Sequence, residues 1–297
     1  GLPIQRYLHN NLVSLKNKLQ KQSGNGLVVT DSVFSMDGDR ADIEAINKIL
    51  NKSESLLRQD DAHGFGIFEP NIPKHSIYMA TLGKAAGVMG AFVAGDEDFI
   101  EFLIQKSRPY IYTTAIPSCL CEATLKSLEL IQEREQKEKL FNNINYFKKF
   151  ASKLGLKFSI SESAIQPLGI RSSSKALKLS QKLFEDGFFV SAIRPPTVAP
   201  NTARLRFTLS ADHNFQQIEL LLEKVKDSTL PSSYFKSLLS IGSLSVGSLS
   251  LLVGVSRPED GSSSSSTITF FEILSVDSLF KGSFDILFLV LSSSVFT

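Results

Sequence analysis

The stretch that decides the fold runs from Gln59 to Gly87 and reads "QDDAHGFGIFEPNIPKHSIYMATLGKAAG". It opens with two adjacent carboxylates, Asp60 and Asp61, and places His63 in the glycine-rich turn that follows. It closes with Lys84 among small residues. Open α/β sheets bind ligands at the carboxyl ends of their strands. The stretch therefore predicts a polar site where one strand ends, with a lysine shortly after the next strand.

Strands alternate with helices on both sides of this stretch. The run "GLVVT" at 26–30 is typical of a buried strand, and "SIYMA" at 76–80 and "AFVAG" at 91–95 indicate strands on either side of the lysine. Apolar residues at helical spacing predict helices at 10–22, 41–50, 97–106, 119–134 and 135–154. This alternation favours an α/β fold with a mainly parallel sheet.

The second half of the chain predicts a smaller α+β domain and then a change of composition. A strand, a helix and two strands are expected at 157–161, 173–187, 188–193 and 204–209, followed by a helix at 214–228. We expect a partial large domain at 1–150, a small domain at 151–227 and a Ser-rich tail at 228–297. The tail has no clear helical or strand period and contains "GSSSSS" at 261–266. It is interpreted as an extension unrelated to the fold. A membrane-associating tail is the lesser alternative, because its longest apolar run is too short to span a bilayer.

Composition excludes several classes of function. The 297 residues carry a formal net charge of +2, which gives no electrostatic footprint for nucleic acid or a membrane surface. The two cysteines, Cys119 and Cys121, have neither disulfide-framework nor zinc spacing, so a reducing, cytoplasmic compartment is expected. The first residues do not form a signal peptide. No metal site is expected, because the DDAH turn lacks a spaced third or fourth ligand.

Lys84 is the first candidate for chemistry. A lysine is ordinarily a solvated surface charge, but this one has no charged neighbour between Tyr78 and Gly95. Partial desolvation would lower the pKa of its ammonium and make the amine a nucleophile that can form a Schiff base with a carbonyl. Thr81, three residues earlier, offers a hydroxyl to a phosphate oxygen.

Three further candidates surround the expected strand-end cleft. Asp60 would need a cationic partner if buried, and a protonated pyridine nitrogen such as that of pyridoxal phosphate is one. His63 could contact the ring of such a cofactor, although a capping or core histidine is the ordinary alternative. Ser35 would face the same cleft, although its turn could simply end a strand, with Asp39 capping the next helix. Arg194, held before two prolines, could grip a carboxylate bidentately or pair with a surface acid.

Five segments, taken in order, resemble the α-oxoamine synthases, pyridoxal-phosphate enzymes of fold type I. They are "VVTDSVFSMDGDRADI", "DDAHGFG", "TLGKAAGVMGAFVAG", "RPYIYTTAIP" and "AIRPPTVAPNTARLRFTLSADH". The resemblance covers residues 5–227. It implies that the N-terminal region of the family has no counterpart in this sequence and that the tail is unrelated.

The resemblance also implies a role for each candidate residue. Lys84 would hold pyridoxal 5′-phosphate covalently, Asp60 would pair with the pyridine nitrogen, and Thr81 would contact the phosphate. His63 and Ser35 would contact the ring oxygen. Arg194 would bind the substrate carboxylate, with Thr197 near the substrate.

The implied reaction condenses L-alanine with a pimeloyl thioester and releases carbon dioxide, as in biotin biosynthesis. The acyl donor would be pimeloyl-CoA or a pimeloyl carrier protein, and a cytoplasmic homodimer is expected. Two alternatives stay open. One is another α-oxoamine synthase that uses glycine or serine, and the other is a non-catalytic fragment or structural subunit of this fold.

Overall fold

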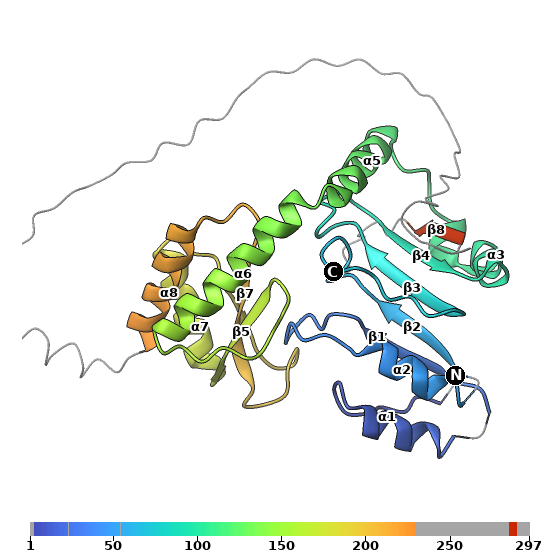
Figure 1. The fold of residues 1–297 in the computed structure, drawn as a ribbon, viewed down its shortest axis with the longest axis horizontal. Helices are drawn as coiled ribbons and strands as arrows, with labels where there is room; N and C mark the ends of the chain where they lie inside the picture. The colour runs from blue at the N-terminus through green and yellow to red at the C-terminus, as the bar shows by residue number, and fades with distance from the viewer. Residues whose placement is uncertain (1–2, 23, 54, 230–284, 290–297) are drawn as a thin grey trace, which may run out of the picture. The chain divides into compact units, whose positions relative to one another are not determined.

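The structure is a computed structural model that describes residues 3–22, 24–53, 55–229 and 285–289. The chain divides into two compact units, residues 1–228 with 276–297, and residues 229–275. Apart from residue 229, the second unit lies outside the described residues. Everything that follows concerns the first unit (Figure 1).

A five-stranded mixed sheet forms the first part of this unit, in the order β1-β2-β3-β4-β8. β1 (Leu27–Asp31), β2 (Leu56–Asp60) and β3 (Ser76–Thr81) are parallel to one another. β4 (Ala91–Gly95) runs antiparallel to β3, and β8 (Asp285–Leu289) runs antiparallel to β4. The α/β class and the first three predicted strands are thus confirmed, with the lysine in the turn between β3 and β4.

The apolar sequence of β1 predicts a strand that is buried on both faces, but in the described part of the chain only one face is buried. Val28 is buried, but Leu27 and Val29 are 53% and 48% exposed, and so is Leu56 of β2, at 47%. Side chains alternate across a strand, and the register pairs Leu27 with Leu56, so the exposed side chains lie on one face. In the described structure this part of the sheet is covered on one side only.

Two capped helices cover the other side of β1 and β2. α1 (Leu12–Leu19) and α2 (Ile43–Leu50) pack together and form a core with the two strands. Asn11 caps α1 and Asp42 caps α2, each accepting a hydrogen bond from the backbone amide three residues on. The expected cap of α2 at Asp39 is therefore wrong, since the helix begins later. The core side chains are Leu15, Val28, Ile43, Ile46, Leu50 and Leu57.

The turn that carries Lys84 depends on glycine for its backbone. Gly87 and Gly90 have φ values of +66° and +120°, which residues with a Cβ rarely adopt. A Cβ at Gly87 would meet no atom within 4 Å. The positive φ is therefore by itself a reason for glycine at this position.

Helices connect the sheet to the rest of the unit. α3 (Glu97–Lys106), α5 (Ser118–Gln132) and α6 (Glu135–Lys153) match the predicted helices. The short α4 (Arg108–Ile111) was not predicted. α6 spans the division expected at residue 150 and packs its apolar face into the core of the following residues, and that division stays a prediction.

Residues 135–229, here called the α6–α8 region, form a second sheet with its own core. β5 (Ile165–Arg171), β6 (Ser191–Ile193) and β7 (Ala203–Thr208) pair in the antiparallel order β5-β7-β6. α7 (Ser173–Glu185) and α8 (Phe215–Thr229) complete it. The core joins all three helices to the sheet, and its most buried members are Ile144, Phe147, Leu183, Leu205, Phe207, Ile218, Leu222 and Val225.

The strand predicted at 157–161 is wrong. The segment is irregular, and one backbone bond, from Ser159 to the Pro167 carbonyl, joins it to β5. Its apolar residue Phe158 packs edge-on against Phe147 and Phe207, which explains the strand-like pattern without a ladder. The true strand escaped prediction because Pro167, Gly169 and a register shift interrupt it.

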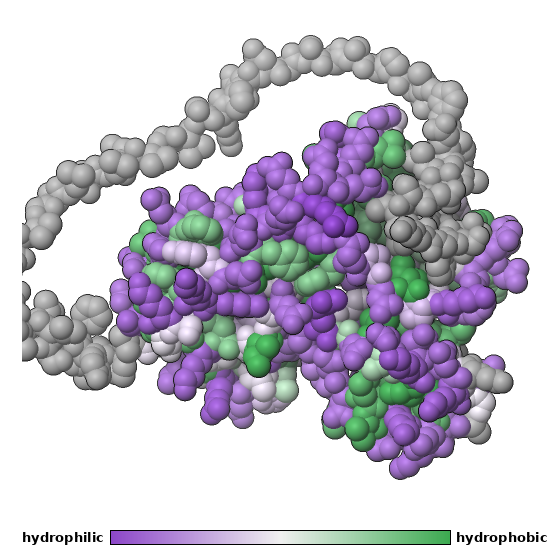
Figure 2. Space-filling model, in the orientation of Figure 1, coloured by the Kyte–Doolittle hydropathy of each residue, from purple (hydrophilic) through white to green (hydrophobic). Residues whose placement is uncertain are grey.

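Most of the predicted tail lies outside the described residues. Within it, Asp285–Leu289 forms β8, although the sequence showed no strand period there. Among the described residues, no helix is both long and apolar enough to cross a membrane. The face of the molecule in Figure 2 is mainly hydrophilic, with smaller hydrophobic areas between the polar side chains.

Candidate functional site

Three parallel strands bring polar side chains to one edge of the sheet. β1 ends at Asp31, β2 at Asp60 and β3 at Thr81, and the register pairs Asp31 with Asp60. His63 and Lys84 lie in the turns that follow β2 and β3. The predicted clustering of Asp60, His63, Thr81 and Lys84 at strand ends therefore agrees with the topology, while their roles are not tested by it.

Lys84 is exposed, but its ammonium is affected by the protein. Burial lowers the pKa of Lys84, and the positive charge of Arg206 acts in the same direction, while Asp60 and Asp31 oppose them. A lowered pKa increases the fraction of free amine near neutral pH. The side chain thus has the electrostatic setting of a nucleophilic lysine.

His63 is held in its neutral form. Burial lowers its pKa to about 4, the charges of Lys84 and Arg206 add to this effect, and Asp60 opposes it. A neutral imidazole offers one donor and one acceptor. At neutral pH the ring can therefore make a hydrogen bond to a ligand oxygen without adding a charge.

Asp60 and Asp31 form a pair of carboxylates at the strand ends. Asp60 accepts a hydrogen bond from the Ala62 amide at 3.1 Å and lies 3.9 Å from an Arg58 guanidinium nitrogen. Burial raises the pKa of Asp31, and the neighbouring charge of Asp60 raises it further. Asp31 was assigned no role from the sequence, although its position at the end of a strand parallel to β2 could have indicated one.

Two buried polar atoms of the site have no hydrogen-bond partner among the described residues. They are the hydroxyl of Thr81 and the Nε of Arg206. Buried polar groups are ordinarily paired, so both point to a ligand. Arg206 was not singled out from the sequence. A charged residue within the alternating strand segment "RLRF" was the available signal.

The turn that carries Ser35 is held from the α6–α8 region. Arg206 donates to the Ser35 carbonyl at 3.0 Å, and Ser161 donates to the Gly38 carbonyl at 3.0 Å. Arg204 pairs with Asp37 in the same turn. Gly38 has φ +70°, and a Cβ there would lie 2.4 Å from a backbone oxygen of β5. The contact therefore requires glycine.

Arg194 and Thr197 lie elsewhere, in the turn after β6. Both residues are exposed, and their recorded contact is a backbone bond from the Thr197 amide to the Arg194 carbonyl. Within the described residues, no hydrogen bond or ion pair joins either side chain to the strand-end set. Their predicted roles stay predictions.

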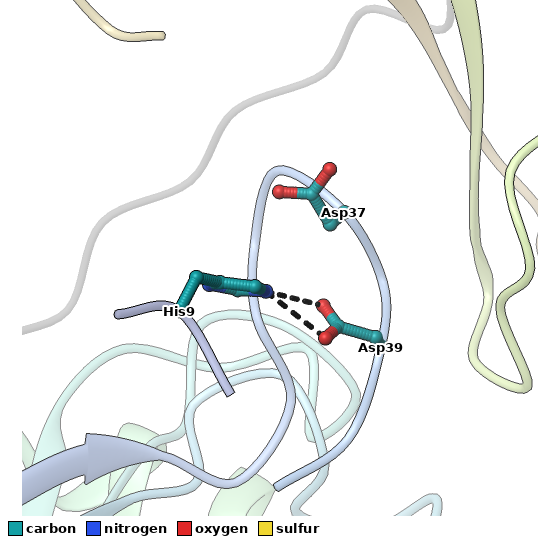
Figure 3. Close-up of side chains that lie close together, drawn as sticks. All are labelled: His9, Asp37 and Asp39. Carbon is teal, nitrogen blue, oxygen red and sulfur yellow. Dashed lines mark hydrogen bonds and ion pairs between the residues drawn. The ribbon is translucent and has the colours of Figure 1, made fainter. Parts of the chain in front are cut away.

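One group of possible metal ligands occurs among the described residues, namely His9, Asp37 and Asp39, with ligand atoms within 4.8 Å of one another. Figure 3 shows His9 directed at Asp39, and its Nε2 lies 3.0 and 3.2 Å from the two carboxylate oxygens. Asn10 also donates to Asp39, and Arg204 pairs with Asp37. Because these carboxylates already have donors as partners, the cluster is explained by structure, and we assign it no metal.

The site contains a lysine that follows a strand end of a mixed α/β sheet. Comparison with known proteins identifies the family to which this arrangement belongs. Residues 1–225 match the family model of class I and II aminotransferases, and the chain belongs to this family. It is 48% identical over 239 residues to an 8-amino-7-oxononanoate synthase of Pseudomonas putida, covering 76% of this chain and 61% of that relative. The chain thus spans about three fifths of the length of the curated relatives that it matches.

Two solved structures support the fold assignment. A serine palmitoyltransferase from S. paucimobilis with bound PLP and myriocin aligns with a TM-score of 0.70 at 25% identity, over 78% of this chain and 61% of the other. An 8-amino-7-oxononanoate synthase from Francisella tularensis aligns with a TM-score of 0.63 at 29% identity, over 78% and 69% of the two chains. The predicted fold type I architecture is confirmed.

Proposed function

We propose that this chain binds pyridoxal 5′-phosphate at Lys84 and serves the decarboxylative condensation of L-alanine with a pimeloyl thioester to give 8-amino-7-oxononanoate. The observation that carries the proposal is the setting of Lys84, an amine of lowered pKa coupled to Asp60 and His63 at the strand ends. The relatives that are 48% identical to it over 239 residues are named for this product.

The residues present fit this cofactor. The unpartnered Thr81 hydroxyl can donate to a phosphate oxygen, and the Asp60 carboxylate can accept from a protonated ring nitrogen. Neutral His63 can donate to a ring oxygen, with Ser35 as a second contact. When bound, pyridoxal phosphate supplies an electron sink for a carbanion.

Side chains of this chain would then bind the substrate and move its proton. The unpartnered Nε of Arg206 makes this guanidinium a candidate to bind the alanine carboxylate, alongside the predicted Arg194 and Thr197. The lowered pKa of Lys84 suits its amine to accept the proton from the alanine α-carbon near neutral pH.

The remaining parts of the proposal concern partners and location. Pimeloyl-CoA or a pimeloyl carrier protein would be the acyl donor, and a cytoplasmic homodimer would be the working form in biotin biosynthesis. Size-exclusion chromatography with light scattering tests the dimer, and assays with each donor separate the two carriers.

The central test uses borohydride and the full chain. Reduction after addition of pyridoxal phosphate should fix the cofactor on Lys84, as found by peptide mapping. Labelling of another lysine would overturn the assignment.

A second candidate is an α-oxoamine synthase with another amino acid, which the alignment to serine palmitoyltransferase favours. Titrating the cofactor-loaded chain with alanine, glycine and serine separates the two, because the true substrate should change the visible absorbance at the lowest concentration.

The non-catalytic alternative is tested by thermal unfolding. A ligand that binds the folded state raises the unfolding temperature, so no shift with pyridoxal phosphate would support an inert chain.

A further inference from the structure

Asp61, the second carboxylate of the DDAH turn, is buried and hydrogen-bonded to the sheet. The residue is only 4% exposed. The Tyr78 hydroxyl of β3 donates to its Oδ2 at 2.6 Å, and the Ser32 side chain, which directly follows β1 and donates to Gln59 Oε1 at 3.5 Å, also lowers the pKa of the carboxyl. One carboxylate thus joins the three strands whose ends carry the site.

The backbone of the same residue holds the turn that contains His63. The Asp61 amide donates to the Met79 carbonyl at 2.8 Å, which fixes the end of β2 against β3. The Asp61 carbonyl accepts from the amides of Gly64 and Phe65 at 3.0 and 2.9 Å. The turn that carries the His63 imidazole is therefore held at its first residue, Asp61, by hydrogen bonds that its amide donates and its carbonyl accepts.

The surroundings leave the Asp61 side chain little freedom. A Cβ at Gly64 would lie 2.2 Å from Asp61 Oδ1 and 3.1 Å from a Val33 methyl. Burial raises the pKa of Asp61 to about 6, while the hydrogen bonds from Tyr78 and Ser32 oppose this rise. A buried carboxylate kept at this cost has a structural or functional reason.

We infer that Asp61 is a positioning residue, which, through Tyr78 and Ser32, holds the Asp60 carboxylate and the His63 imidazole in register with Lys84. It does not touch the ligand, because its side chain is sealed in the sheet. This inference rests on the proposed function, since the register matters only if the three residues bind one ligand. The sequence alone assigned Asp61 no role.

The test compares three variants of the full chain for their affinity for pyridoxal phosphate, measured by visible absorbance at a temperature where each is folded. Asp61→Leu keeps the branched shape of the side chain but removes the acceptor, and should weaken binding by about tenfold or more. Asp61→Asn keeps an acceptor for Tyr78 and should bind within about threefold of the unmodified chain. Tyr78→Phe removes the donor and should fall between them.

A matched control separates positioning from a general loss of stability. Tyr146 donates to Glu219 between α6 and α8, so Glu219→Leu removes a tyrosine–carboxylate bond in the other region. This variant should unfold at lower temperature yet bind pyridoxal phosphate unchanged. Unchanged binding in Asp61→Leu and Tyr78→Phe would overturn the inference, as would a loss of binding in Glu219→Leu equal to theirs.

A second readout does not need the cofactor. In the cofactor-free chain, NMR titration of His63 should show its pKa moving from about 4 toward the ordinary value of 6.5 in Asp61→Leu. If the unmodified chain binds no pyridoxal phosphate, the proposed function fails, and the His63 titration still decides whether Asp61 holds the turn. If Asp61→Leu does not fold, Tyr78→Phe carries the same comparison, and an unshifted His63 there overturns the inference.

Discussion

The β1–β4 region, residues 27–95, and the α6–α8 region place their titratable groups differently. In the first, desolvation is the largest cause of the pKa shifts of Asp31, Asp61, His63 and Lys84. In the second, the shifts found come from surface hydrogen bonds: the pKa of Tyr146 is raised mainly by its bond to Glu219, and that of Glu135 is lowered mainly by its bond from Lys139. The α6–α8 region instead concentrates apolar side chains into one core. Stability is thus expected mainly from one region and chemistry from the other.

The largest effect should come from Lys84→Ala. Removing the amine should abolish covalent attachment of pyridoxal phosphate, while the free energy of unfolding changes by no more than about 0.5 kcal/mol, because the side chain is exposed. Absorbance after addition of the cofactor and urea unfolding measure the two quantities. If the cofactor still attaches to Lys84→Ala, or if this variant loses much stability, the assignment of chemistry to the β1–β4 region and of stability to the α6–α8 region is contradicted. Lys74→Ala is the exposed control.

The next largest effect should come from Phe207→Ala in the other region. This ring is 2% exposed and packs against Phe147 and Phe158, so its removal should lower the free energy of unfolding by about 3–5 kcal/mol. Phe189→Ala, at a residue that is 86% exposed, should change it by less than about 0.5 kcal/mol. Equal losses in the two variants, measured by urea unfolding, would contradict the assigned core.

The pH dependence of stability sharpens the comparison within the site. The unfolded chain binds the His63 proton with a pKa of 6.5 and the folded chain with one of about 4, so this group makes stability rise with pH between those values. Asp61 acts oppositely. Its pKa rises from 3.8 to about 6 on folding, so its contribution falls as pH rises through that window.

Single variants should separate these two slopes in the cofactor-free chain. His63→Asn should leave stability falling from about pH 4 to about pH 6, and Asp61→Asn should leave it rising over the same window. Urea unfolding at several pH values measures both curves. Two variants with the same slope would show that at least one of these side chains is not buried as described.

The smallest effect should distinguish the two faces of β1. Val29→Thr, on the exposed face, should change the free energy of unfolding by less than about 0.5 kcal/mol. Val28→Thr is the matched change on the buried face and should cost about 1–3 kcal/mol, because it buries a hydroxyl. A cost at Val29 that matches the one at Val28 would mean that another surface covers this face in solution.

Local pattern predicted most of the fold. Periodic helices such as α6 and strands with clear boundaries such as β3 and β4 follow from side-chain spacing. The sequence pattern did not predict β5, because Pro167 and Gly169 interrupt the pattern of a strand and the strand it pairs with lies far away in sequence. The exposure of Val29 also could not be predicted, since an apolar run does not say whether both faces of a strand are covered.

The site was predictable where its residues follow strands and not where distant elements supply them. Asp60, His63, Thr81 and Lys84 fall at the ends of predicted strands. Arg206 comes from β7, and only the packing of that strand beside the Ser35 turn gives its guanidinium a place in the site. No spacing rule connects residues so far apart in the chain.

The pairing of β8 with β4 has a consequence for the order of folding. β4 leaves the ribosome long before β8 is synthesised, and closing so long a loop is slow compared with local pairing. Until then one side of β4 presents unpaired amides and carbonyls, the kind of edge on which strands of other chains can dock. The nascent protein is therefore expected to be most prone to self-association before residues 285–289 have been synthesised, and least prone once β8 has docked.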